Sequence, residues 1–218
     1  AGGDIILVLG PEPSLKWRTF SEQLMGVADH FGSSMMLTLG ALLADVPHSR
    51  PVQIIGTATD DDLIDRFELQ RSRYEGPTGI VGVLHDSCYT AAMPSAALWA
   101  AVPAYASQVP SPKASLSLMR RACEIIGTPA PVASVMNLIE RYEDQVNSLV
   151  SDDEDLAAYV ERLETMSDNG MSLDDEVDDG QLQFDFATDS GDDAADEPDA
   201  STLMDEVEQF LREQGEGK

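Results

Sequence analysis

The chain has 218 residues, with 40 acidic and 13 basic side chains and a formal net charge of −27. Phosphate backbones and anionic membranes attract a basic surface, so we expect no binding to nucleic acid or to a membrane. Hydrophobic residues make up 43% of the chain, which is enough for a core in one domain with additions.

The cysteines and the absence of long apolar runs indicate a cytoplasmic protein. Cys88 and Cys123 lie far apart in apolar stretches, which is more typical of buried thiols in a reducing compartment than of a disulfide. No run is long enough to span a bilayer, and residues 1–3 lead straight into a predicted strand, which leaves no room for a signal peptide.

Alternating strand and helix signals predict an α/β domain over residues 1–130. The apolar run at 4–9, ended by Gly10, predicts the first buried strand. Further strands are predicted over residues 34–39, 52–55 and 95–102, and helices over 14–32, 59–67, 79–92 and 111–127. Residues 79–84 alone resemble a strand, but the longer apolar period favours a helix there. This alternation is typical of a three-layer α/β/α fold with a mostly parallel sheet.

Residues 131–166 predict a helical hairpin that packs on this domain or on another subunit. Apolar side chains recur at helical spacing in two stretches separated by a charged turn, where Ser151 and Glu154 form a capping box. The candidate interaction residues are Leu138, Tyr142 and Val146 in the first stretch, and Leu156, Tyr159 and Leu163 in the second.

Residues 167–218 form an acidic tail. Residues 151–218 carry 24 acidic and 3 basic side chains, against 16 and 10 in residues 1–150. The low apolar content predicts a largely disordered tail, with a short amphipathic helix near 202–213. Leu182, Phe184 and Phe186 alternate like a short strand, either as isolated apolar residues in a solvated tail or as a docking motif.

The sequence contains no recognisable catalytic or metal-binding motif. None of the three lysines follows a glycine-rich loop, and the three histidines have no partner at metal-ligand spacing. No G-x-S-x-G elbow is present. We therefore assign no catalytic residue, metal or cofactor.

The best polar cluster lies in loops that follow predicted strands. Open α/β sheets bind ligands at such positions, so this cluster is the candidate ligand site. Its side chains could converge on a small anion or a peptide terminus, or Arg50 and Glu75 could simply pair and hold two loops together. The candidate cleft residues are Glu12, His48, Arg50, Tyr74, Glu75 and Thr78.

Several strings in residues 4–166 resemble the bacterial branch of the proteasome assembly chaperone family, the type 2 chaperone-like proteins. They are GPEPSLKWRTF, ADVPHSRPV, GTATD, SRYEGPTGIVGVLHDSC, PSAALWAAVPAY and ERYEDQVNSLV. The resemblance implies a fold related to nucleoside phosphorylases, and its eukaryotic relatives act as chaperone pairs that help to assemble the proteasome α-ring.

The sequence departs from that family at both ends. Family members usually have further strands before the position of Asp4, so we expect a sheet with an exposed edge or an edge that a partner covers. The chain also ends without the hydrophobic-Tyr-any residue motif of proteasome-docking chaperones.

These features favour a non-enzymatic assembly-chaperone-like or protein-interaction protein. We expect a homo-oligomer that associates through the hairpin and binds a protein partner, with proteasome subunits as the class that the resemblance implies. The alternative is a small-molecule-binding enzyme that uses the cleft, similar to phosphorylases or hydrolases; the ATP-grasp label of some relatives has no support in these residues. A third hypothesis is a scaffold whose tail is the functional part.

Overall fold

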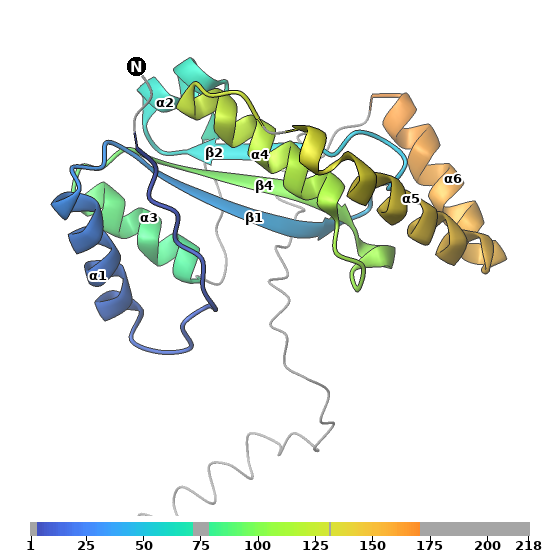
Figure 1. Cartoon of the computed structure of the whole chain (residues 1–218), viewed down its shortest axis with the longest axis horizontal. Helices are drawn as coiled ribbons and strands as arrows, with labels where there is room; N and C mark the ends of the chain where they lie inside the picture. The colour runs from blue at the N-terminus through green and yellow to red at the C-terminus, as the bar shows by residue number, and fades with distance from the viewer. Residues whose placement is uncertain (1–3, 72–78, 131, 171–218) are drawn as a thin grey trace, which may run out of the picture. The chain divides into compact units, whose positions relative to one another are not determined.

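The computed structural model describes residues 4–71, 79–130 and 132–170. Within these ranges the chain forms a four-stranded sheet with helices on both faces, followed by two further helices (Figure 1). The predictions for residues 171–218, including the short helix and the alternating apolar residues, lie outside the described ranges.

The sheet has the strand order β1-β4-β2-β3. Its strands are β1 (Met36–Ala44), β2 (Ile54–Ala58), β3 (Gln70–Arg71) and β4 (Ser95–Pro103). β1 and β4 are parallel over their whole length, β2 and β3 are parallel, and β2 and β4 are antiparallel. The predicted mostly parallel sheet is therefore confirmed, and β1 lies at one edge.

The four helices of the α/β part form the two outer layers. They are α1 (Trp17–His30), α2 (Asp61–Phe67), α3 (Ile80–Thr90) and α4 (Pro112–Ile126). In Figure 1, α1 and α3 lie on one side of the sheet, and α2 and α4 lie on the other. The three-layer prediction is confirmed, as is the helix predicted over 79–92.

Short side chains on the central strand let these layers approach. In β4 the short side chains of Ala96 and Ala100 are fully buried. On the neighbouring strand, a Cβ at Gly40 would overlap the ring of Trp99, its register partner across the β1–β4 ladder. Glycine is therefore the residue that lets this indole lie flat against β1.

A half-buried histidine connects α3 to the sheet. The Nε2 atom of His85 lies 2.9 Å from the hydroxyl of Thr38 on β1, and Nδ1 lies 2.9 Å from the hydroxyl of Ser95 on β4. Burial lowers the pKa of His85. Cys88, one turn further along, is fully buried, and burial raises the pKa of its thiol. Both Cys88 and Cys123 are free thiols.

The predicted hairpin consists of α5 (Met136–Ser151) and α6 (Glu154–Asp168), preceded by the 3-10 turns η1 (Ala104–Ala106) and η2 (Val132–Ser134). The predicted cap at Ser151 is wrong. Asp153 is the N-cap of α6, since its carboxylate accepts from the backbone N–H groups of Asp155 and Leu156 at 2.9 and 3.0 Å.

The predicted strand over residues 4–9 is also wrong. This segment is neither helix nor strand, and Leu7 and Leu9 are 84% and 94% exposed. A strand needs a neighbour for its backbone hydrogen bonds, and the described residues supply none here. The predicted cap at Ser14 is displaced too, because α1 begins at Trp17 after Lys16 in the left-handed conformation.

Candidate functional site

The hairpin packs on the α/β part through the inner faces of its two helices. Tyr142 and Val146 of α5 are buried and cluster with Ala106 of η1. Val160 and Leu163 of α6 are buried as well. Full burial of one such aliphatic side chain is worth about 1.5–3 kcal/mol, so this burial stabilises the packed hairpin.

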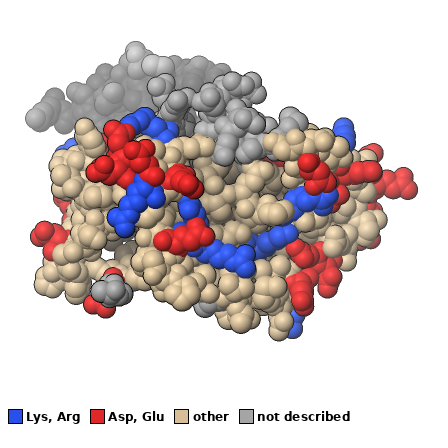
Figure 2. Space-filling view, turned by 90° about the horizontal axis from the view of Figure 1, so that it is seen from above, with Lys and Arg blue, Asp and Glu red and all other residues tan. Residues whose placement is uncertain are grey.

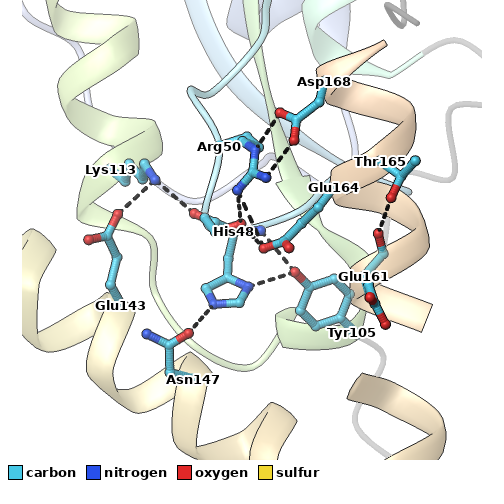
Figure 3. A network of polar contacts seen from close by, with 11 residues as sticks. His48, Arg50, Tyr105, Lys113, Glu143, Asn147, Glu161, Glu164, Thr165 and Asp168 are labelled. Carbon is cyan, nitrogen blue, oxygen red and sulfur yellow. Dashed lines mark hydrogen bonds and ion pairs between the residues drawn. The ribbon is translucent and has the colours of Figure 1, made fainter. Parts of the chain in front are cut away.

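His48, in the loop between β1 and β2, is the polar centre of this contact (Figure 3). It is only 4% exposed. Its backbone N–H donates to the hydroxyl of Tyr105 at 2.8 Å, and the same hydroxyl lies 2.9 Å from Nδ1 of the ring. The other ring nitrogen, Nε2, lies 2.9 Å from Oδ1 of Asn147 on α5.

These partners assign the proton of the imidazole. The amide oxygen of Asn147 can only accept, so Nε2 of His48 carries the proton and donates. Nδ1 then accepts from the hydroxyl of Tyr105, whose oxygen accepts the backbone N–H. Burial raises the pKa of Tyr105 to about 12, so this hydroxyl keeps its proton at neutral pH. Both ring nitrogens and the backbone N–H of this buried histidine therefore have partners within the chain.

Arg50 binds the second helix of the hairpin. Its Nε and Nη2 atoms each donate to one carboxylate oxygen of Asp168 at 2.7 Å, and Nη1 lies 3.5 Å from Oε1 of Glu164. The hydroxyl of Ser49 donates to the same carboxylate of Glu164. The hydrogen bonds from Arg50 hold the pKa of Asp168 below its usual value. Exposed pairs of this kind contribute little stability, but their two-pronged geometry fixes an orientation.

Two more contacts complete the connection. The hydroxyl of Tyr159 on α6 donates to Asp45 at 2.7 Å. Lys113 of α4 donates to the backbone carbonyl of His48 at 2.8 Å and to Glu143 of α5 at 2.7 Å. One loop therefore contacts three helices. We call this set the hairpin clamp, and its members from the body are Asp45, His48, Ser49, Arg50, Tyr105 and Lys113.

The ion pairs of α4 belong to a surface of mixed charge. In Figure 2, Lys and Arg side chains form a band across the face seen from above, and Asp and Glu side chains border it. Two basic residues of α4 form ion pairs with nearby glutamates: Lys113 with Glu143 at 2.7 Å, and Arg121 with Glu124 at 3.0 Å.

A pocket of about 240 Å³ lies between the ends of β1 and β4 and the start of α4. Tyr142 is the only ionisable residue among its lining residues, which belong to the described ranges. Acid–base catalysis needs positioned groups that exchange protons near the working pH. Burial raises the pKa of Tyr142, so this pKa lies further from neutral pH than that of an exposed tyrosine.

The structure groups two of the six predicted cleft residues. His48 and Arg50 lie in one loop, and both use their donors on groups of the chain itself. Glu12 lies elsewhere, with Oε1 3.4 Å from the backbone nitrogen of Ile80 at the start of α3. Convergence on a ligand stays a prediction, because three candidates lie outside the described residues: Tyr74, Glu75 and Thr78.

The six predicted interaction residues divide between the inner and outer sides of the hairpin. Tyr142, Val146 and Leu163 are buried against the chain itself. Leu156 and Tyr159 are half-buried, and Leu138 is 50% exposed. The three buried residues and Tyr159 therefore make contacts within the chain, whereas Leu138 keeps an exposed side chain.

No local pattern in the sequence predicts Tyr105, Lys113 or Asn147 as members of this site. Tyr105 and Asn147 lie 57 and 99 residues from His48 in the chain, so no local spacing relates them. The one available signal is the position of Tyr105, a hydroxyl-bearing residue that follows directly on a buried apolar strand and is expected to find a partner there.

The described ranges contain no group of three or more His, Cys, Asp or Glu side chains that could hold a metal ion. Among the helices of those ranges, none combines the length and the apolar character that crossing a bilayer requires.

A family model described as PAC2 family matches residues 1–150. The chain belongs to the PAC2 family. Two solved structures support this PAC2 assignment: a PAC2 family protein from Streptomyces avermitilis is 41% identical, covering 69% of this chain and 63% of that chain with a TM-score of 0.63. A proteasome-assembly chaperone homologue from Mycobacterium tuberculosis is 42% identical. The match covers 68% of this chain and 63% of that chain, with a TM-score of 0.61.

More distant structures share the fold of this PAC2 chain. An archaeal proteasome activator from Pyrococcus furiosus is 15% identical, covering 60% of this chain and 56% of that chain, with a TM-score of 0.52. The chain spans 63% of the length of each of the two bacterial structures that it matches at over 40% identity. The comparison with curated proteins finds no match.

Proposed function

We propose that this PAC2 protein is a non-enzymatic, assembly-chaperone-like protein that binds a protein partner through the outer face of its α5–α6 hairpin. The observation that carries the proposal is that polar residues of the loop between β1 and β2 hold this hairpin. His48, Arg50 and Lys113 all form hydrogen bonds with other groups of the chain. A clamped hairpin presents a surface of fixed shape, which lowers the ordering cost of binding.

The outer face of α5 has the apolar residues that a protein interface uses. Leu138 and Leu149 are 50% and 43% exposed, and their separation of eleven residues places them on one side of the helix. Met136 and Met166 are also exposed. Apolar side chains surrounded by charged ones are typical of interaction surfaces.

Proteasome subunits are the partner class that the relatives support. The 42% identical structure from Mycobacterium tuberculosis is described as a proteasome-assembly chaperone homologue. For the present chain the partner is part of the proposal.

The test is binding of the purified chain to purified proteasome subunits from the same cells, followed by native mass spectrometry. We expect a complex with the wild-type chain, and its loss with the double variant Leu138→Asp and Leu149→Asp. Ile126→Asp is the matched control, because Ile126 is 44% exposed at the end of α4, outside the hairpin. Absence of a complex, or equal binding by the double variant, would refute the proposal.

A further inference from the structure

Three sulfur atoms from α1, β1 and α3 lie in contact where these elements pack together. Sγ of Cys88 on α3 lies 3.5 Å from Sδ of Met36 at the start of β1, and 3.8 Å from Sδ of Met25 on α1. Cys88 is fully buried, and the two methionines are half-buried. The methionines precede Cys88 by 52 and 63 residues in the chain, so no motif spacing in the sequence reveals the cluster.

The arrangement suits a soft metal ion. Thiolate and thioether sulfurs are the donors that Cu(I) favours. Donors that bind one ion at about 2.3 Å lie about 3.8–4.0 Å apart in tetrahedral or trigonal coordination, which is close to the separations of these sulfurs. The thiol proton of Cys88 points at one thioether at a time, whereas an ion in its place binds all three sulfurs.

The charge balance selects a monovalent ion. Binding replaces the thiol proton by the ion, so the thiolate of Cys88 and Cu(I) together carry no net charge, and both thioethers are neutral. A divalent ion would leave one positive charge at a fully buried position, which is costly without a further anion.

Neighbouring hydroxyl groups orient this cluster. The hydroxyl of Ser95 on β4 forms a hydrogen bond with Cys88 and lies 2.9 Å from Nδ1 of His85. Nε2 of His85 in turn lies 2.9 Å from the hydroxyl of Thr38 on β1. Hydrogen bonds of this kind hold the ligands of metal sites in position. The methionine side chains are unbranched and flexible, so they can move aside as an ion enters.

We propose that Met25, Met36 and Cys88 form a Cu(I) site, in which one thiolate and two thioethers bind a single ion. Bound there, the ion links α1, β1 and α3 at one point. The site shares no residue with the hairpin clamp or with the outer face of α5, so it is tested independently of the function proposed above.

Anaerobic titration of the 218-residue chain with Cu(I), in competition with the chromophoric chelator bicinchoninate, tests this site. We expect one ion per chain. X-ray absorption of the copper-loaded protein should show sulfur neighbours at about 2.3 Å. The 40 acidic side chains offer only hard oxygen donors, which suit other metal ions, so sulfur around the copper identifies the binding residues.

Substitutions that keep the volume of the core assign the ligands. Met25→Leu and Met36→Leu each remove one sulfur and retain an apolar side chain of similar size, so the fold persists, which circular dichroism checks. Each should weaken Cu(I) binding at least about tenfold, and Cys88→Ser should abolish it.

Two matched controls should bind Cu(I) as the wild type does. Met35→Leu changes the residue next to Met36, which packs instead against a core cluster that includes Leu63 of α2 and Ala122 of α4. Cys123→Ser removes the other free thiol. Absence of Cu(I) uptake overturns the proposal, as does uptake that Cys88→Ser or either of the Met25 and Met36 variants leaves unchanged, because the sulfurs would then serve packing alone. Loss of uptake in Cys123→Ser overturns it too.

Discussion

Replacing Tyr105 by Phe tests whether the hairpin clamp is a stabilising network. The substitution keeps the ring and removes one oxygen, which leaves the backbone N–H and Nδ1 of His48 without their partner. A buried polar group that loses its partner costs about 1–3 kcal/mol. Two such groups in a loop residue that is 4% exposed give an expected loss of about 2–4 kcal/mol in the free energy of unfolding.

Urea unfolding followed by circular dichroism measures this loss, and hydrogen exchange shows where it acts. We expect faster exchange in α5 and α6, because Asn147 of α5 is anchored through the same histidine. Tyr89→Phe is the matched control, since Tyr89 is exposed and loses the same oxygen at the surface. A loss below about 0.5 kcal/mol for Tyr105→Phe, or unchanged exchange in the hairpin, would show that the network does not hold the helices.

Two further predictions concern the body. Gly40→Ala should lower the free energy of unfolding by about 1–3 kcal/mol, because the added Cβ would overlap the packed indole of Trp99. Gly10→Ala is the control, since a Cβ there meets no neighbouring atom. Urea unfolding midpoints should fall for the first variant and stay unchanged for the second. The lowered pKa of His85 means that the unfolded chain binds a proton that the folded chain does not, so stability should fall as pH drops below about 6.5. In His85→Gln, midpoints measured from pH 7.5 down to 5 should lose that part of the slope, and an unchanged slope would contradict the assignment.

Helices with local start and stop signals were predictable from the sequence. Ser111 caps α4 through the backbone N–H of Ala114, Pro112 takes the first helical position, and Gly127 ends the helix with a positive φ of 77°. These features act over a few residues, so the sequence alone reveals them. The apolar period correctly identified α3 for the same reason.

Features that depend on distant partners were not predictable. Residues 4–9 have the composition of a strand, but composition does not supply a neighbouring strand. The loop around His48 was recognised as polar, yet its partners Tyr105 and Asn147 come from η1 and α5. A ligand site and a structural clamp show the same local pattern, and only the contacts in three dimensions distinguish them.

Those contacts bear on how this PAC2 protein works. A binding cleft keeps donors free for its ligand, whereas His48 and Arg50 direct theirs at Asn147 and Asp168. Buried residues of the hairpin supply the attraction, and the clamp restricts it to one orientation. Within the described residues, the outer face of α5 keeps exposed apolar side chains that another molecule can reach. Such surfaces recognise proteins by complementarity rather than by chemistry on a small molecule.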